Sequence, residues 1–201
     1  YPNNITLRSG RIYHLIGESG RGKTTFLDVI AGLTTVDDTT RILINGSPSD
    51  SNILAACSHV TCYVGDWSFI EQGSVSHYFE SHGITDFKEI ERSLGLVGLT
   101  NEEESPPSLE RKHLINLSTN SHIEDGGRNL SAGQRKRLSL AVSLATRPNI
   151  LLLDEVFANL DRESTERLIK IIRLELPSTI VIFTVHDSFL SRYADEVIDL
   201  Q

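Results

Sequence analysis

Short apolar runs alternate with helix-like patterns along most of the chain. The runs that have the length and composition of buried strands lie at 11–16, 149–155 and 179–186. Apolar residues at helical spacing predict helices at 24–33, 131–146 and 162–176. Apolar strands that alternate with helices indicate a mostly parallel sheet with both faces covered. The pattern therefore predicts an α/β fold.

Two more β-rich segments follow the first predicted helix. Residues 41–50 predict a strand closed by a turn at Asn45 and Gly46, because Asn-Gly is the strongest short hairpin signal. Residues 59–65 predict another strand. Both segments precede a marked change in the character of the chain.

The chain becomes more polar after residue 65. The elements predicted there are two helices and an acidic, proline-containing loop, at 74–82, 86–97 and 101–108. We therefore predict a core formed by residues 1–65 and 130–201, with a helical subdomain inserted at 66–129.

Composition excludes some classes of protein. An apolar content of 39% and a charged content of 23% are ordinary for a globular domain. The formal net charge of −8 argues against nucleic acid as the main partner, because phosphate binding needs clustered Lys and Arg. We interpret the basic triplet 135–137 as a solvated helix face. No run approaches eighteen apolar residues, so no membrane span is predicted.

The stretch GESGRGKTT, at 17–25, lies between the first predicted strand and the first predicted helix. It satisfies GxxxxGK[ST], in which glycines let backbone N–H groups converge on an anion at a helix N-terminus. Lys23 would neutralise the β- and γ-phosphates, and Thr24 would offer an oxygen to Mg²⁺. The predicted phosphate-binding residues are Gly17, Ser19, Gly20, Arg21, Gly22, Lys23, Thr24 and Thr25.

Hydrolysis also needs a metal ligand and a group that orients water. Asp154 ends a buried run and suits Mg²⁺, while the next residue, Glu155, suits the attacking water. His186 ends the last run, at the sheet edge where ligands bind, and could hydrogen-bond the γ-phosphate. Taken alone, the acids could be a helix cap or a solvated turn, and the histidine could be structural.

Together with the segment NLSAGQRKRLSLA, these motifs resemble the nucleotide-binding domain of an ABC transporter. Residues 130–134 resemble the LSGGQ signature, and 159–161 resemble the D-loop. The resemblance implies ATP and Mg²⁺ as cofactors and a head-to-tail dimer. Each ATP would lie between the phosphate loop of one copy and Ser131, Gly133 and Gln134 of the other. By itself, SAGQ is equally consistent with an ordinary helix start.

The segments GSVSHYF (73–79) and IEDGGRNLSAGQ (123–134) resemble exporter-type members of the family. This implies an ATPase at the cytoplasmic face of a membrane that powers substrate translocation. The chain contains no Met and opens on Tyr1, so we expect it to be cut from a longer protein. The transmembrane part is expected to be fused upstream.

The chain departs from the family pattern at three places. Asp66 stands where the Q-loop glutamine is expected, and we keep it as a candidate metal ligand. Only sixteen residues precede Gly17, so we expect the N-terminal antiparallel strands and their adenine-stacking aromatic residue to be truncated or altered. Ala132 replaces the first signature glycine.

Two other functions stay open. Asp66 and the missing adenine platform would suit a nucleotide-binding regulatory module with little turnover. A soluble, non-transport ABC ATPase acting on DNA or ribosomes is the other alternative. The 63 residues between Asp66 and Leu130 contain no heptad run, which argues against the DNA-repair members with their long coiled coil.

Overall fold

The structure is a computed structural model that describes residues 5–34, 42–49, 60–65, 70–100, 117–158, 160–185 and 187–200. The chain divides into two compact units. Unit 1 consists of Tyr1–Tyr63, Pro148–Ala158 and Ser178–Gln201, and unit 2 consists of Val64–Arg147 and Asn159–Pro177. The predicted insertion of a helical subdomain at 66–129 stays a prediction.

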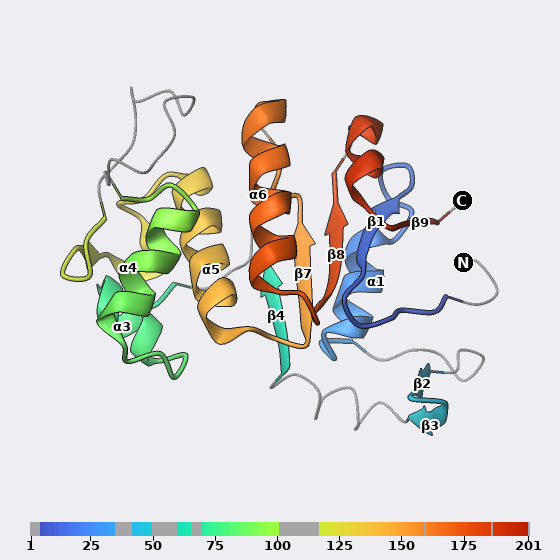
Figure 1. The fold of residues 1–201 in the computed structure, drawn as a ribbon, viewed down its shortest axis with the longest axis horizontal. Coiled ribbons are helices and arrows are strands. Elements are labelled where there is room, and N and C mark those ends of the chain that lie inside the picture. The colour runs from blue at the N-terminus through green and yellow to red at the C-terminus, as the bar shows by residue number, and fades with distance from the viewer. Residues whose placement is uncertain are drawn as a thin grey trace. The chain divides into compact units, whose positions relative to one another are not determined.

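A five-stranded sheet forms the centre of unit 1 (Figure 1). Its strands, in spatial order, are β4 (Thr61–Val64), β7 (Ile150–Asp154), β8 (Ile180–Thr184), β1 (Ile12–Ile16) and β9 (Glu196–Asp199). Strand β8 pairs in parallel with β7 and with β1, and β1 pairs in parallel with β9. The predicted α/β fold with a mostly parallel sheet is therefore confirmed.

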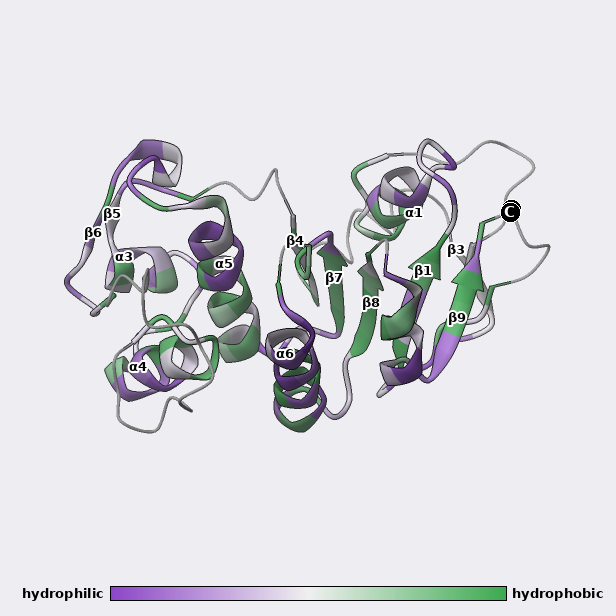
Figure 2. Ribbon diagram, turned by 90° about the horizontal axis from the view of Figure 1, so that it is seen from above, coloured by the Kyte–Doolittle hydropathy of each residue, from purple (hydrophilic) through white to green (hydrophobic). Residues whose placement is uncertain are grey.

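The sheet holds together because its central strands are apolar on both faces, as the hydropathy colouring of β7 and β8 shows (Figure 2). Helix α1 (Lys23–Ile30) contributes Leu27 to the core, and Ala31 follows the helix. The buried core cluster comprises Tyr13, Leu15, Leu27, Ala31, Leu152, Ile182, Ile198 and Leu200.

The strand register brings the residues at the ends of β1, β7 and β8 to one edge of the sheet, where the candidate site residues lie. Thr184, at the end of β8, is aligned with Asp154 on one side and with Leu15 on the other. Parallel strands end at the same edge, where ligands bind in open α/β sheets. The loop after β1 therefore begins beside the carboxyl ends of β7 and β8.

Two features of unit 1 bear on the sequence predictions. The Asn-Gly turn is confirmed, because it joins β2 (Ile42–Ile44) to β3 (Ser47–Ser49) with positive φ at Asn45 and Gly46. Strand β9 and the 3₁₀ helix η4 (Ser188–Tyr193) were not predicted. Strand β9 is short and lies at the edge of the sheet, so only part of it is buried and its apolar pattern is weak.

Unit 2 is mainly helical. Its elements are β5 (Gly73–Ser74), α3 (Val75–Glu80), α4 (Phe87–Leu96), β6 (His122–Ile123), η3 (Asp125–Gly127), α5 (Ala132–Thr146) and α6 (Arg162–Glu175). The four α-helices confirm the predicted ones, and each begins after a Ser or Asp whose side chain accepts from a backbone N–H. Among the helices in the described part of the chain, none is long and apolar enough for a membrane span.

His14 is a fully buried histidine in the middle of β1. Its ring stacks on Phe183, with 4.5 Å between centroids. Its Nε2 lies 3.3 Å from the carbonyl oxygen of Val185, so this nitrogen carries the proton. Its Nδ1 then accepts from Ser191 Oγ at 2.8 Å. Burial lowers the pKa of His14, although the negative charge of Asp187 opposes this shift.

We expect His14 to make unfolding depend on pH. The unfolded chain binds a proton near pH 6.5, whereas the folded chain binds it only at lower pH. Stability should therefore fall as the pH drops below about 6.5, by at most about 1.4 kcal/mol per pH unit for this one group. His14→Gln keeps a donor and an acceptor but cannot titrate. Urea unfolding between pH 5 and 8 should show a flatter profile for the variant, and equal slopes would contradict the assignment.

Candidate active site

The loop between β1 and α1 has the backbone conformation that phosphate cradles need. Its turns use left-handed φ angles of 81° at Gly20 and 85° at Gly22. A side chain at either position would be strained whatever space surrounds it. The two glycines therefore allow the chain to curl tightly before α1 begins at Lys23.

Helix α1 presents an uncapped N-terminus to this loop. Its N-cap is Gly22, which has no side chain to accept from the first N–H groups, and its first turn contains no acidic residue. The free N–H groups and the helix dipole favour an anion at this position. Every other α-helix of the described residues has a side-chain cap, so the uncapped start of α1 is specific to the loop.

The polar side chains of the loop are placed for contact with solvent or ligand. Lys23 Nζ donates to the carbonyl oxygens of Gly17 at 2.7 Å and Glu18 at 3.0 Å, so its ammonium group lies over the loop backbone. Arg21 forms an exposed ion pair with Glu18 at 3.4 Å. The predicted residues that are exposed here are Ser19, Gly20, Arg21, Thr24 and Thr25.

A groove runs beside the loop within unit 1. It is lined by Ile16, Gly17, Glu18, Arg21 and Asp199. Asp199 belongs to β9, which the sequence patterns did not predict. The groove therefore adds one carboxylate next to the loop that the motif could not indicate.

Asp154 lies at the end of β7 with both carboxylate oxygens hydrogen-bonded. Its Oδ2 accepts from Thr24 Oγ1 at 3.2 Å and from Tyr63 Oη at 2.8 Å. Its Oδ1 accepts from Thr184 Oγ1 at 2.7 Å. Two of the three predicted metal ligands, Thr24 and Asp154, are thus brought together although 130 residues separate them. Sequence reasoning missed Tyr63 and Thr184.

Glu155 follows Asp154 in an unusual backbone conformation. Its φ of 51° lies in the left-handed region, which costs a residue with a Cβ roughly 1–2 kcal/mol. Its N–H donates to Thr184 Oγ1 at 3.0 Å, and its carbonyl oxygen accepts from the N–H of Ala158 at 3.2 Å. Strained backbone of this kind persists when surrounding contacts fix it, and it gathers at functional sites.

Asp28 adds a second carboxylate near Asp154. It lies on α1, one turn after Thr24. Burial raises the pKa of Asp28, and the negative charge of Asp154 raises it further. The neighbourhood of Asp154 is therefore anionic, which suits a cation. The signal that could have found Asp28 is its spacing of four residues from Thr24, which places both on one face of the helix.

The signature segment begins α5 in unit 2 and caps itself. Ser131 Oγ accepts from the N–H of Gln134 at 3.2 Å, and Gln134 Oε1 accepts from the N–H of Ser131 at 2.7 Å. This reciprocal pair is a capping box. Within one copy, Ser131 and Gln134 therefore act as an ordinary helix start, which is the alternative interpretation of SAGQ. Gly133 is exposed.

The basic triplet after the signature is not a solvated face, and that prediction is wrong. All three residues are only partly exposed. Arg135 Nη1 donates to the carbonyl oxygen of Leu130 at 2.8 Å. Burial lowers the pKa of Arg137, while the charge of Asp161 opposes the shift. The long side chains of Arg135 and Arg137 are held by packing and by carbonyl groups. These residues are therefore less exposed than their charges alone would predict.

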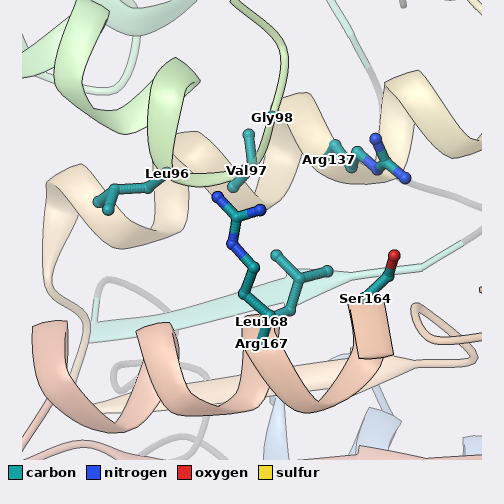
Figure 3. A pocket seen from close by; sticks show the side chains of 7 residues that line it. All are labelled: Leu96, Val97, Gly98, Arg137, Ser164, Arg167 and Leu168. Carbon is teal, nitrogen blue, oxygen red and sulfur yellow. The ribbon is translucent and has the colours of Figure 1, made fainter. Parts of the chain in front are cut away.

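Arg137 also lines a small pocket within unit 2. The pocket is bordered by Leu96, Val97, Gly98, Arg137, Ser164, Arg167 and Leu168 (Figure 3). Arg167 reaches from α6 toward Val97 and Gly98. Burial lowers the pKa of Arg167, and its buried Nη1 has no hydrogen-bond partner among the described residues. The end of α4 lies there, so the charge faces the negative end of a helix.

Two predicted site residues, Asp66 and His186, lie outside the described residues. The same holds for Asn159 of the predicted D-loop and for the acidic loop at 101–108. Their predicted roles stay predictions. Val185, next to His186, is described and accepts from His14.

Known proteins resemble this chain over nearly its whole length. It is 29% identical over 191 residues to a spermidine/putrescine import ATP-binding protein of Pasteurella multocida, covering 92% of this chain and 46% of that protein. It is 29% identical over 197 residues to a methionine import ATP-binding protein of Caulobacter vibrioides, covering 96% of this chain and 56% of that protein. The chain thus spans about half the length of these relatives. Both are named as import proteins, so their names do not support the exporter-type resemblance.

Residues 2–158 match the family described as ABC transporter, which is more than half of the chain. The matched range contains the phosphate loop, the signature and the acid pair. The chain therefore belongs to the ABC transporter family, the family that its sequence motifs resemble.

Proposed function

We propose that the chain binds MgATP at the loop 17–25 and hydrolyses it to power the movement of a substrate across a membrane. The observation that carries this proposal is the pairing of Thr24 Oγ1 with Asp154 Oδ2, 3.2 Å apart at the uncapped start of α1. The start of α1, which favours an anion, thereby lies next to the oxygens of Thr24 and Asp154, which favour a cation. Bound phosphates with their metal ion need this combination.

The residues present fit Mg²⁺. The ion prefers oxygen ligands, and the side chains that converge here offer a hydroxyl and a carboxylate. Thr24 and Asp154 would hold it, and the predicted ligand Asp66 would join them. When bound, Mg²⁺ would offset the negative charge of the phosphates. The carboxylate of Asp28 adds negative charge nearby.

The remaining groups of unit 1 take complementary roles. Lys23 exchanges its bonds to the carbonyl groups of Gly17 and Glu18 for bonds to the phosphate oxygens. The N–H groups at the start of α1 receive the phosphates. Glu155 orients the attacking water and accepts its proton, and His186 hydrogen-bonds the γ-phosphate.

The second half of the catalytic site comes from another copy of the domain. The N–H groups at the start of α5, beside Ser131 and Gly133, would approach the γ-phosphate bound by the partner copy. Gln134 and Ser131 would keep capping each other and so hold this helix start in shape. The arrangement makes hydrolysis depend on a head-to-tail dimer.

We further propose that the domain works with a transmembrane partner at the cytoplasmic face of a membrane, which the naming of its relatives as import ATP-binding proteins supports. Those names favour import, whereas the segment 73–79 favours an exporter-type arrangement with the transmembrane part fused upstream. The ATP chemistry proposed for unit 1 is the same for both directions.

Phosphate release by the chain should require Mg²⁺ and rise with protein concentration. If two copies form each site, the rate per molecule should increase as the protein is concentrated, and EDTA should abolish it. Nucleotide binding is measured in parallel with a fluorescent ATP analogue. Binding without phosphate release at any concentration would favour the regulatory module instead. Absence of both would contradict the proposal.

A further inference from the structure

Thr184 lies between the two acidic residues of the candidate active site. It is the last residue of β8, only 1% exposed, and aligned with Asp154 across the sheet. Its hydroxyl donates to Asp154 Oδ1 at 2.7 Å and accepts from the N–H of Glu155 at 3.0 Å. A hydroxyl has one hydrogen to donate. The Thr184 hydroxyl therefore donates its hydrogen to the carboxylate of Asp154 and accepts the N–H of Glu155 with a lone pair.

The two oxygens of Asp154 have different surroundings. Its Oδ2 faces Thr24 and Tyr63, and Thr24 is the other proposed metal ligand. Its Oδ1 is held by Thr184. The Thr184 hydroxyl therefore fixes the plane of the carboxylate and leaves Oδ2 directed at the metal site. A cation held by Thr24 and Asp154 would replace the hydrogen bond between them, whereas the bond from Thr184 to Oδ1 would remain.

The bond to Glu155 has a second consequence. The left-handed φ of 51° at Glu155 sets the direction in which its side chain leaves the sheet. Its N–H would be left without this partner if the Thr184 hydroxyl were removed. The buried hydroxyl of Thr184 thus contacts both the carboxylate of Asp154, which is proposed to bind the metal, and the backbone of Glu155, whose side chain is proposed to orient water.

We propose that Thr184 is a positioning residue that aligns Asp154 for Mg²⁺ and Glu155 for water, an inference that rests on the proposed function. Valine has nearly the same shape as threonine and differs by the hydroxyl. Thr184→Val therefore removes both hydrogen bonds, while the valine side chain still fills the buried space that the threonine occupied. Thr184→Ser restores the hydroxyl and should restore function.

The chain offers a matched control on the approach to the same strand. Thr179 precedes β8, is 5% exposed, and its hydroxyl donates to the carbonyl oxygen of Pro148 at 2.6 Å. Thr179→Val thus removes a buried hydroxyl and its hydrogen bond at the end of β8 away from the candidate site. Its effect on thermal unfolding measures what the loss of a buried hydroxyl costs the fold.

The test compares ATP affinity with Mg²⁺ and with EDTA, using a fluorescent ATP analogue, together with kcat and KM. For Thr184→Val we expect the gain in affinity from Mg²⁺ to shrink by about 10-fold and kcat to fall by about 10- to 100-fold, because small misplacements of reacting groups cost rates of this order. Affinity in EDTA should stay within about twofold of the unmodified chain, since phosphate contacts are untouched. Thr179→Val should change neither Mg²⁺ dependence nor kcat.

The inference is overturned if Thr184→Val matches Thr179→Val in Mg²⁺ dependence and in kcat, or if Thr184→Ser fails to restore them. If Thr184→Val does not fold, Thr184→Ala carries the same prediction, with Thr179→Ala as its control. An unmodified chain that binds no MgATP would overturn the proposed function itself. Normal MgATP binding with an unaffected Thr184→Val variant overturns only the role of Thr184.

Discussion

Replacing Glu155 with glutamine is expected to lower steady ATP turnover by about 10²–10⁴-fold, the range that a positioned general base contributes. Glutamine keeps the size of the side chain and its place after Asp154, but it cannot accept the proton of the attacking water. Binding of MgATP should persist, because the groups that contact phosphate and metal are unchanged. The variant should therefore accumulate as an ATP-bound dimer.

The measurement is phosphate release at matched protein concentrations, with size-exclusion chromatography in MgATP to detect the dimer. A suitable control is Glu196→Gln, the same change at an exposed residue of β9. Glu196 is aligned with Tyr13 near the beginning of β1, away from the strand end at which the phosphate loop starts. The control should release phosphate at the unmodified rate. Unchanged release by Glu155→Gln would remove Glu155 from the proposed role.

Features that depend on neighbouring residues could be predicted from the sequence. The phosphate loop needs glycines at fixed spacing before a helix, and Gly20 and Gly22 adopt the left-handed angles that this motif implies. The Asn45–Gly46 hairpin and the helix caps follow from equally local rules. The central strands could be predicted because burial on both faces requires continuous apolar runs.

Contacts set by the strand register could not be predicted in this way. Thr184 and Tyr63 meet Asp154 only because β8 and β4 lie on either side of β7. Neither residue belongs to a motif, and a threonine that ends an apolar strand has no distinctive pattern. The hydrogen-bond partners of His14 could not be predicted for a related reason, because Ser191 and Val185 follow it by more than 170 residues.

The charges of α5 illustrate a second limit. Judged by charge alone, three consecutive basic residues indicate a solvated helix face. Arg135 instead donates hydrogen bonds to the carbonyl groups of Gly127 and Leu130, which precede the helix. Gly127 adopts a φ of 66°, and a Cβ there would lie 3.0 Å from Arg135 Cδ. The close packing of a glycine against an arginine stem depends on tertiary structure, so charge patterning could not indicate it.

Lys23 should account for much of the affinity for ATP. Its ammonium group already lies over the loop, 2.7 Å from the carbonyl oxygen of Gly17, and reaching a bound phosphate requires only a change of partner. Hydrogen bonds to charged groups contribute roughly 1.5–3 kcal/mol each. Lys23→Ala should therefore weaken MgATP binding by about 10- to 100-fold, and turnover at low ATP concentration should fall at least as far.

Calorimetric titration with MgATP measures the loss, and Lys170→Ala is the matched control. Lys170 is exposed on α6 and forms an i,i+4 pair with Glu166 at 2.7 Å, an interaction of only about 0.3–0.5 kcal/mol. Thermal unfolding of Lys23→Ala should stay close to that of the unmodified chain, because the carbonyl groups it leaves can bind water at the exposed loop. Full ATP affinity in Lys23→Ala would mean that the N–H groups at the start of α1 hold the phosphates alone, and the charge on Lys23 would then have no part in recognition.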